Sequence, residues 1–191
     1  PGNWHNYWRV LTNSEMTSNY HLLAVDRPGF GASAEGGFEG SMEAQSNYIM
    51  EALKTELEKS KAENRGAILV GHSLGGPIIV RMALDDPDWV AGLVIVAGSV
   101  SPELEELRWY NHVAAFPLIS WALPEVLVSS NREILPAKGE LLEMEPRLGE
   151  LELPIVVIQG ELDDLVPPGN ADYAKAAYVN SEVDVWMYPD L

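Results

Sequence analysis

Short apolar runs alternate along the chain with longer stretches in which apolar residues recur every three or four positions. The runs predict strands at residues 21–26, 67–70, 93–97, 155–158 and 183–188. Strands that are buried on both faces are apolar at successive positions, as these runs largely are. Their alternation with helices predicts an α/β fold with a mostly parallel sheet flanked by helices.

Two helices are expected between the first three strands. Residues 41–61 carry apolar side chains at three- and four-residue spacing, and Ser41 is suited to cap the first turn. Residues 77–84 are expected to continue a second helix, which ends near Asp86 because Pro87 follows it.

Residues 101–150 differ from the rest, because they contain several prolines and no strand-like run. The segment carries four bulky aromatic residues, Trp109, Tyr110, Phe116 and Trp121. We interpret them as packing residues, which in a cap would line a pocket. A segment of about 50 residues is too long for an ordinary connection. It is therefore expected to be a small helical cap or lid, with residues 1–100 and 151–191 forming the α/β core.

Composition narrows the classes of partner. A chain of 191 residues is long enough for one domain with a substantial core. The formal charge of −17 argues against nucleic acid and anionic membrane surfaces, which are also negative. The absence of cysteine excludes thiolate catalysis and cysteine-ligated metal. No phosphate-binding glycine loop or metal-ligand motif is present, so we expect a small-molecule substrate and no cofactor or metal.

The sequence carries no membrane or targeting signal. No apolar run approaches the roughly 20 residues of a membrane span, and no signal peptide is visible. We therefore expect a cytoplasmic protein without a membrane partner. The sequence does not predict an oligomeric state.

The sequence Gly-His-Ser-Leu-Gly-Gly at residues 71–76 follows an apolar run and precedes a helical segment. A strand, a tight Gly-x-Ser-x-Gly turn and a helix are the parts of a nucleophile elbow. In such a turn Ser73 has a strained backbone that exposes its hydroxyl, and the turn leaves no room for Cβ atoms at Gly71 and Gly75. The N–H of Leu74, at the helix N-terminus, is suited to stabilise an oxyanion. The alternative is a glycine-rich turn with a purely structural role.

Two further motifs accompany this turn in the order of a known family. Residues 26–33 read Asp-Arg-Pro-Gly-Phe-Gly-Ala-Ser, and residues 160–167 read Gly-Glu-Leu-Asp-Asp-Leu-Val-Pro. With residues 71–76, they make almost the whole chain resemble the α/β-hydrolase superfamily. The resemblance implies a loop after the family's fourth strand at 26–33, an acid-bearing loop after its seventh strand at 160–167, and a variable cap at 101–150. Arg27 is then expected to be a structural hydrogen-bond donor rather than an anion binder.

The acid of a catalytic triad is expected at Asp163, which follows the predicted strand at 155–159. Its role would be to orient a histidine and to stabilise the imidazolium that forms. The adjacent Asp164 is also acidic, but the spacing of the motif at 160–167 favours Asp163. The alternative is a loop aspartate that caps the turn after it.

The histidine of the triad does not fit the pattern. The four histidines are His5, His21, His72 and His112. All precede Asp163, whereas the family's chain order is serine, acid, histidine. His72 lies inside the elbow and is expected to point elsewhere, and His21 is expected to be structural. Residues 185–191 resemble the strand and loop that lead into the family's Gly-His, so the catalytic histidine is expected beyond Leu191.

The first residues likewise resemble a part of the family's sequence that other functional residues precede. Residues 1–4 resemble the stretch after the family's His-Gly-x oxyanion loop, which places the second oxyanion donor before Pro1. The third family strand would pair between residues 22–26 and 67–71, and its absence would leave two rows of backbone groups unpaired. The chain is therefore expected to be a fragment of a longer gene and to be inactive by itself.

These motifs predict a serine hydrolase that acts on a small ester or related acyl substrate. Ser73 would attack the acyl carbonyl, and water would later release the acyl-enzyme. The elbow serine argues against haloalkane dehalogenase and epoxide hydrolase chemistry, for which the family uses aspartate there. Hydrolysis of amides, lactones or carbon–carbon bonds and perhydrolysis stay open. The alternative function is a non-catalytic ligand-binding or sensor protein of the same fold.

Overall fold

The computed structural model describes residues 3–60, 66–107, 109–121 and 123–191. The chain falls into two compact units, Pro1–Gly40 with Arg108–Ile134 and Ser41–Leu107 with Leu135–Leu191. Three sequence predictions lie outside the described residues, at Pro1, at Lys61 and at the side chain of Tyr110. The division into a core and a cap stays a prediction.

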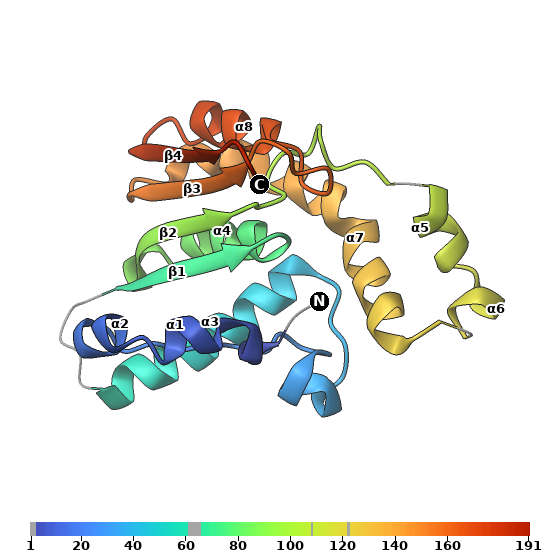
Figure 1. Ribbon diagram of the computed structural model, residues 1–191, viewed down its shortest axis with the longest axis horizontal. Helices are drawn as coiled ribbons and strands as arrows, with labels where there is room; N and C mark the ends of the chain where they lie inside the picture. Colours follow the sequence, from blue (N-terminus) through green and yellow to red (C-terminus); the bar gives the residue numbers. More distant parts are fainter. Residues whose placement is uncertain (1–2, 61–65, 108, 122) are drawn as a thin grey trace. The chain divides into compact units, whose positions relative to one another are not determined.

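The second unit is built on a parallel sheet, whose strand arrows point the same way in Figure 1. Its strands are β1 (Ala67–His72), β2 (Val90–Val96), β3 (Ile155–Gly160) and β4 (Val183–Tyr188), in this order across the sheet. In the register, Gly71 lies beside Ile95 and Val94 lies beside Val156. Four of the predicted strands and the α/β fold class are thus confirmed.

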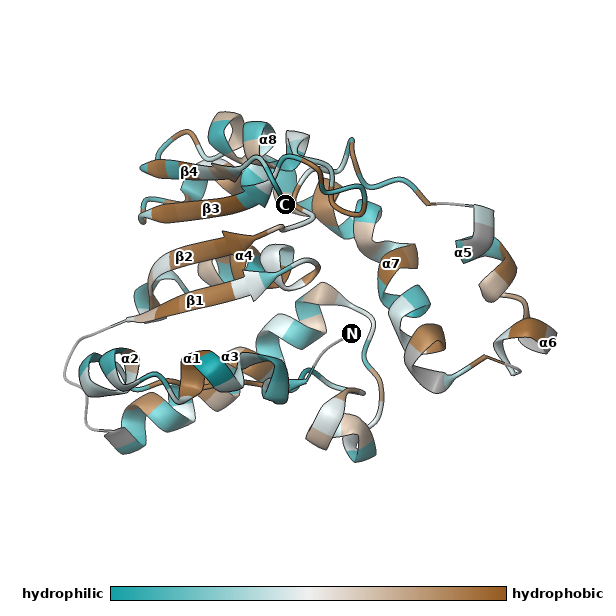
Figure 2. Ribbon diagram, in the orientation of Figure 1, coloured by the Kyte–Doolittle hydropathy of each residue, from teal (hydrophilic) through white to brown (hydrophobic). Residues whose placement is uncertain are grey.

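Helices of the second unit complete the hydrophobic core around this sheet. They are α3 (Met42–Ser60), α4 (Gly75–Asp85), η3 (Pro87–Trp89), η4 (Glu145–Glu150), α8 (Gly169–Ala177) and the second part of α7 (Glu125–Met144). The strands contribute buried residues such as Leu93 and Ile95, and α4 contributes Ile78 and Met82. Figure 2 shows the same division, with mostly hydrophobic strands and helices of mixed character.

The two helices predicted from periodicity are confirmed. The Oγ of Ser41 accepts a hydrogen bond of 3.3 Å from the N–H of Ala44, as expected for a capping residue. The helix α4 ends at Asp85, directly before Asp86 and Pro87. Its buried Pro77 lies near the N-terminus, where a proline removes no intrahelical hydrogen bond.

The first unit is made of short helical segments and loops. They are η1 (Trp4–Tyr7), α1 (Trp8–Leu11), α2 (Ser14–Asn19), η2 (Gly31–Gly36), α5 (Trp109–Ala114), α6 (Pro117–Ser120) and the first part of α7. Asp26 holds two of these segments, because its carboxylate accepts hydrogen bonds from Trp4 N at 2.7 Å and Ala32 N at 2.8 Å. Arg27 pairs with the buried Glu133, which agrees with its predicted structural role.

The prediction of a buried strand at residues 21–26 is wrong. The segment has no strand assignment, and Leu23 and Val25 are 47% and 50% exposed. His21, predicted to be structural at the start of this strand, is exposed as well. A strand requires a neighbour for its backbone N–H and C=O groups, and no described residue pairs with this segment. An apolar run alone cannot supply that neighbour.

The described part of the segment 101–150 contains the helices α5, α6, α7 and η4 and no strand, whereas residues 101–107 form a turn and a loop. The prediction that its aromatic residues pack is wrong for Trp109, Phe116 and Trp121, which are 76%, 63% and 88% exposed. Trp109 begins α5, which has six residues. Phe116 directly precedes α6 and Trp121 directly follows it, and α6 has four residues. Such short helices bury too little surface to cover large side chains.

Candidate active site

Ser73 lies in the turn between β1 and α4 and has a left-handed backbone, with φ of 54°. This region is unfavourable for a residue with a Cβ atom, so the surrounding contacts must hold the conformation. Ser73 N donates to Val96 O at 3.0 Å, and Ser73 O accepts from Gly76 N at 2.9 Å and Ser99 N at 3.3 Å. The strained serine backbone expected of an elbow is therefore present, and the residue is half-buried.

Glycine is required at two positions around the turn. A Cβ atom on Gly71 would lie 2.2 Å from Gly75 O, and one on Gly76 would lie 2.9 Å from the Cα of Gly98. At Gly75, however, a Cβ atom would meet nothing within 4 Å, so the predicted crowding there is wrong. The crowding falls on Gly76 because α4 turns this residue toward the loop after β2. The doubled glycine in the sequence was the signal for this contact.

The N-terminus of α4 offers unpaired donors beside Ser73. Leu74 is the N-cap residue of this eleven-residue helix, with helical angles of φ −59° and ψ −19°. The N–H groups of Leu74 and Gly75 donate to no acceptor among the described residues. The first N–H groups of a helix carry partial positive charge, which favours an anion at this end. This arrangement can stabilise an oxyanion that forms next to the Ser73 hydroxyl.

Asp163 follows β3 at the same edge of the sheet and is half-buried. Its Oδ1 accepts hydrogen bonds from Leu165 N and Val166 N, both at 2.9 Å. This is the turn-capping arrangement that was considered as the alternative for this residue. It occupies one carboxylate oxygen, and Oδ2 accepts no hydrogen bond from the described residues. Asp163 can therefore cap its turn and still receive a further donor, whereas Asp164 is exposed.

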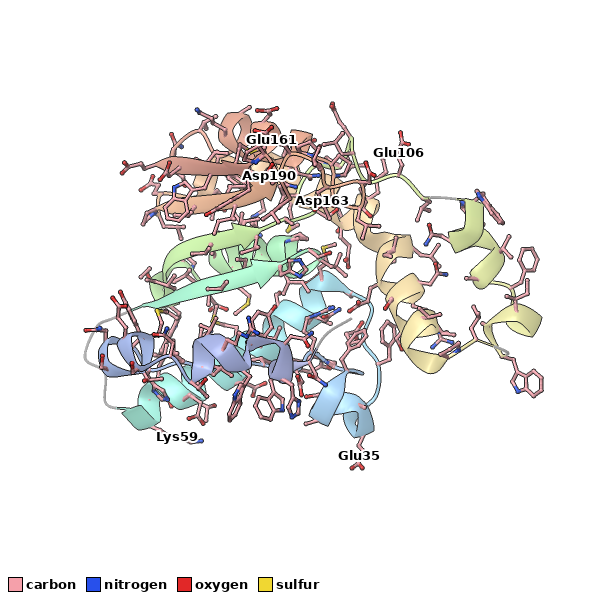
Figure 3. All side chains as sticks on the ribbon, viewed as in Figure 1. Glu35, Lys59, Glu106, Glu161, Asp163 and Asp190 are labelled. Carbon is pink, nitrogen blue, oxygen red and sulfur yellow. The ribbon has the colours of Figure 1, made fainter. Side chains whose placement is uncertain are left out.

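Parallel strands place Ser73 and Asp163 at one edge, because both residues follow the carboxyl ends of their strands. β2 lies between β1 and β3. With a strand spacing of about 4.8 Å, the ends of β1 and β3 are roughly 10 Å apart. Figure 3 shows Asp163 near the arrowheads of the strands. Both residues belong to the second unit.

None of the four histidines is hydrogen-bonded to Ser73 or Asp163. His72 is exposed, and it is the histidine that shares their unit. His5 stacks on Trp4 with ring centroids 3.8 Å apart, and its Nδ1 lies 3.2 Å from Asn3 Oδ1. His21 and His112 are also exposed. The structure thus brings the predicted nucleophile and acid to one sheet edge but brings no described histidine to them by hydrogen bond.

Sequence reasoning missed two polar groups near this edge. Ser99, whose N–H contacts Ser73, donates its hydroxyl hydrogen to Glu105. Asn170, at the start of α8, is 2% exposed and hydrogen-bonds the loops after β2 and β3. Neither residue belongs to a recognisable short motif, so no local signal pointed to them.

Within the described ranges, no three side chains of His, Cys, Asp or Glu converge where they could hold a metal ion. Among the helices that the structure describes, none combines the length and the apolar character needed to cross a membrane.

The known proteins that this chain resembles are hydrolases. The pimeloyl-[acyl-carrier protein] methyl ester esterase of Citrobacter koseri is 26% identical over 94% of this chain and 79% of its own length. A 2-hydroxy-6-oxononadienedioate/2-hydroxy-6-oxononatrienedioate hydrolase of Cupriavidus pinatubonensis is 25% identical, and this chain spans 63% of its length. Among solved structures, the monoacylglycerol lipase of Paleococcus ferrophilus matches with a TM-score of 0.70 at 15% identity, over 97% of this chain and 79% of that one.

The structural match shows the α/β-hydrolase fold, in agreement with the parallel sheet and the strand-turn-helix at Ser73. A family model described as "Serine aminopeptidase, S33" matches residues 9–143. Because this match covers more than half of the sequence, the chain belongs to that hydrolase family within the α/β-hydrolase superfamily.

Proposed function

We propose that the protein is an ester hydrolase in which Ser73 is the nucleophile. The observation that carries this proposal is the left-handed backbone of Ser73, with φ of 54°, next to the unpaired N–H groups of Leu74 and Gly75. A strained serine is costly, and such strain is concentrated at functional sites. The glycine-rich structural turn, considered as an alternative, would need neither the strain nor the free donors.

In the proposed mechanism, Ser73 Oγ attacks the carbonyl carbon of an ester and its proton passes to a histidine base. The N–H of Leu74 donates to the oxygen of the tetrahedral intermediate. The protonated histidine then gives its proton to the departing alcohol, which leaves an acyl-enzyme on Ser73. Water attacks this acyl group and loses a proton to the histidine. As the bond from the acyl carbon to Ser73 Oγ breaks, the histidine returns a proton to Oγ, which releases the acid and the free serine.

Asp163 is proposed as the acid that orients this histidine. Its Oδ1 is held by two backbone N–H groups, so the direction of Oδ2 is set by the turn. An imidazole N–H that donates to Oδ2 would be kept in one tautomer and orientation. The exposed His72 makes no such hydrogen bond, so we propose a base other than His72.

Small esters are the proposed substrate class. The relatives support this, because one is described as a methyl ester esterase and a structural neighbour as a monoacylglycerol lipase. The relatives do not favour the alternative of a non-catalytic binding protein, since they are described as enzymes. The family description names a peptidase, so an amide substrate is the comparison to include in the assay.

The test is the hydrolysis of a p-nitrophenyl acyl ester by the complete gene product. Ser73→Ala should lower kcat by at least about 1,000-fold, because the nucleophile is lost. Ser181→Ala is the matched control, since the Ser181 hydroxyl donates to Leu151 O in another part of the unit. A fluorophosphonate should phosphonylate Ser73 Oγ with loss of fluoride and should add the mass of the phosphonyl group to the peptide that contains Ser73. Equal rates for Ser73→Ala and the unaltered protein would overturn the proposal.

A further inference from the structure

Asn170 is a buried amide that connects two loops of the proposed site. It is the second residue of α8 and is 2% exposed. Its Oδ1 accepts hydrogen bonds from Val100 N at 3.0 Å and Ser101 N at 2.9 Å, in the loop after β2. Its Nδ2 donates to Pro167 O at 3.0 Å, in the loop after β3. One side chain therefore binds both loops through their backbones.

The first of these loops also holds the backbone of Ser73. Ser99 N donates to Ser73 O at 3.3 Å, one residue before the N–H of Val100 that Asn170 binds. The loop starts at Ala97, which has a left-handed φ of 42° and donates to Ile158 O at 2.8 Å. A non-glycine residue in this conformation depends on surrounding contacts to keep it there.

The second loop carries Asp163. Val166 N donates to Asp163 Oδ1 at 2.9 Å, and Val166 O accepts a hydrogen bond of 3.0 Å from Gln159 Nε2. Pro167, whose carbonyl accepts from Asn170, is the next residue. The contacts of Asn170 are thus one residue away from a backbone group that binds Ser73 and one residue away from a group that binds Asp163.

We propose that Asn170 is a positioning residue that sets the separation of Ser73 and Asp163 by tying the loop after β2 to the loop after β3. This inference rests on the proposed function, because it assigns both residues to one reaction. A buried amide whose oxygen and nitrogen are both hydrogen-bonded holds its partners in one geometry. A displacement of about 1 Å in a catalytic group can lower a rate on the order of 100-fold.

The amide suits this position because it combines an acceptor and a donor. An alanine would leave Val100 N and Ser101 N without their partner, whereas Pro167 O would lose the bond from Nδ2 and keep the one of 3.0 Å from the backbone N–H of residue 170. An aspartate would keep an acceptor for the two N–H groups but would lose the donor and place a carboxylate against Pro167 O. The two substitutions therefore separate the link to the loop after β2 from the link to the loop after β3.

The experiment compares Asn170→Ala and Asn170→Asp with Asn180→Ala in the complete gene product. Asn180 is the matched control, since its Nδ2 also donates to a backbone carbonyl, that of Gly149, but it is exposed. Amide hydrogen exchange reports on Val100 and Ser101. Ester hydrolysis gives kcat and KM, with kcat expressed per active site counted from the acyl-enzyme burst. A loss of folded protein changes that count and leaves kcat per site unchanged.

Asn170→Ala should exchange the amides of Val100 and Ser101 at least 10-fold faster and should lower kcat per site by at least 10-fold, with KM within 2-fold. Asn170→Asp should keep slow exchange at these amides while kcat per site still falls. Asn180→Ala should match the unaltered protein in both measurements. If kcat per site stays within 2-fold in Asn170→Ala, the positioning role is wrong. Ser73→Ala is measured in parallel. If the proposed function is wrong, Ser73→Ala keeps the rate of the unaltered protein; if only the positioning role is wrong, Ser73→Ala still loses activity.

If Asn170→Ala does not fold, Asn170→Asp decides the question by itself. It retains the hydrogen bonds to Val100 and Ser101, and its kcat per site must still fall for the proposal to stand. An unchanged kcat per site in Asn170→Asp would overturn the role of the link to Pro167.

Discussion

A Cβ atom placed on Gly71 would lie 2.2 Å from the carbonyl oxygen of Gly75, so the end of β1 and the start of α4 touch through their backbones. Three residues separate the two glycines in sequence, yet a Cβ atom would be crowded only at Gly71. This contact holds the turn in which Ser73 adopts its left-handed conformation. Substituting Gly71 and Gly75 separately by alanine therefore tests whether this backbone contact holds the turn.

Gly71→Ala should unfold or strongly destabilise the turn, because the clash is with backbone atoms that cannot move aside. Gly75→Ala should be tolerated, since nothing lies within 4 Å, and alanine is favoured over glycine in a helix by about 1 kcal/mol. Thermal unfolding of the two variants measures the difference. Equal melting temperatures for both variants would contradict the geometry described for the elbow.

Asp163→Asn should lower kcat by about 10³- to 10⁴-fold, because an amide cannot stabilise an imidazolium as a carboxylate does. Its Oδ1 would still accept from Leu165 N and Val166 N, so the turn should be kept. Asp164→Asn, at the adjacent and exposed residue, should change kcat by less than about 3-fold. The opposite ranking of the two variants would assign the acid to Asp164.

The loops after β2 and β3 carry acidic side chains and no lysine or arginine at residues 97–107 and 160–168. Figure 3 shows Glu161, Asp163 and Glu106 on the side of the second unit where these two loops lie. A negative potential lowers the local concentration of anions. An ester with a free carboxylate should therefore have a lower kcat/KM than a neutral ester of equal size. The difference should shrink as salt is raised, and a salt-independent preference would contradict an electrostatic origin.

Asp85 lies at the end of α4 between two arginines, with Arg81 Nε at 2.5 Å and Arg147 Nη1 at 2.7 Å from its carboxylate oxygens. Partial burial favours the protonated form, but the hydrogen bonds from Arg147 and Arg81 outweigh it and lower the pKa of Asp85. The folded-state pKa is then below that of the unfolded chain. The stabilisation is present above the unfolded value of about 3.9 and is lost as the pH falls through the folded value.

Asp85→Asn should accordingly lower the free energy of unfolding by about 1 kcal/mol at pH 7. The difference from the unaltered protein should disappear at acidic pH, where Asp85 is protonated in both states. Glu150→Gln is the control, because Glu150 also pairs with Arg147 but its side chain is 57% exposed. Urea unfolding at several pH values measures these effects. A loss that stays constant down to acidic pH would exclude the charge of Asp85 as its cause.

Arg27 and Glu133 form an ion pair in the first unit, with side chains 24% and 4% exposed. Removing Glu133 takes away the carboxylate that binds the Arg27 guanidinium in this largely buried place. Glu133→Ala should therefore destabilise the protein by about 3 kcal/mol, as for other buried pairs. The neighbouring Arg132 is exposed, so Arg132→Ala should have an effect below about 0.5 kcal/mol. Similar losses for both variants in chemical denaturation would argue against the burial of this pair.

The strands β1 to β4 could be predicted because each is a short, largely apolar run, which is typical of strands inside a parallel sheet. Residues 21–26 have the same composition but form no strand, because pairing depends on a neighbouring segment that the local pattern does not contain. β1 shows the same dependence on its neighbours: Leu69 is 9% exposed, while Ile68 and Val70 on its other face are 58% and 61% exposed.

The sequence by itself determined the positions of Ser73 and Asp163, since strand, turn and helix propensities are encoded within a few consecutive residues. It also predicted a strained backbone at Ser73, which the structure shows as a left-handed φ of 54°. Only the tertiary structure decided that the crowded glycine is Gly76 rather than Gly75, and that Asn170 joins the two loops. These contacts join residues far apart in the chain, whose distances depend on how strands and helices pack rather than on the residues next to them.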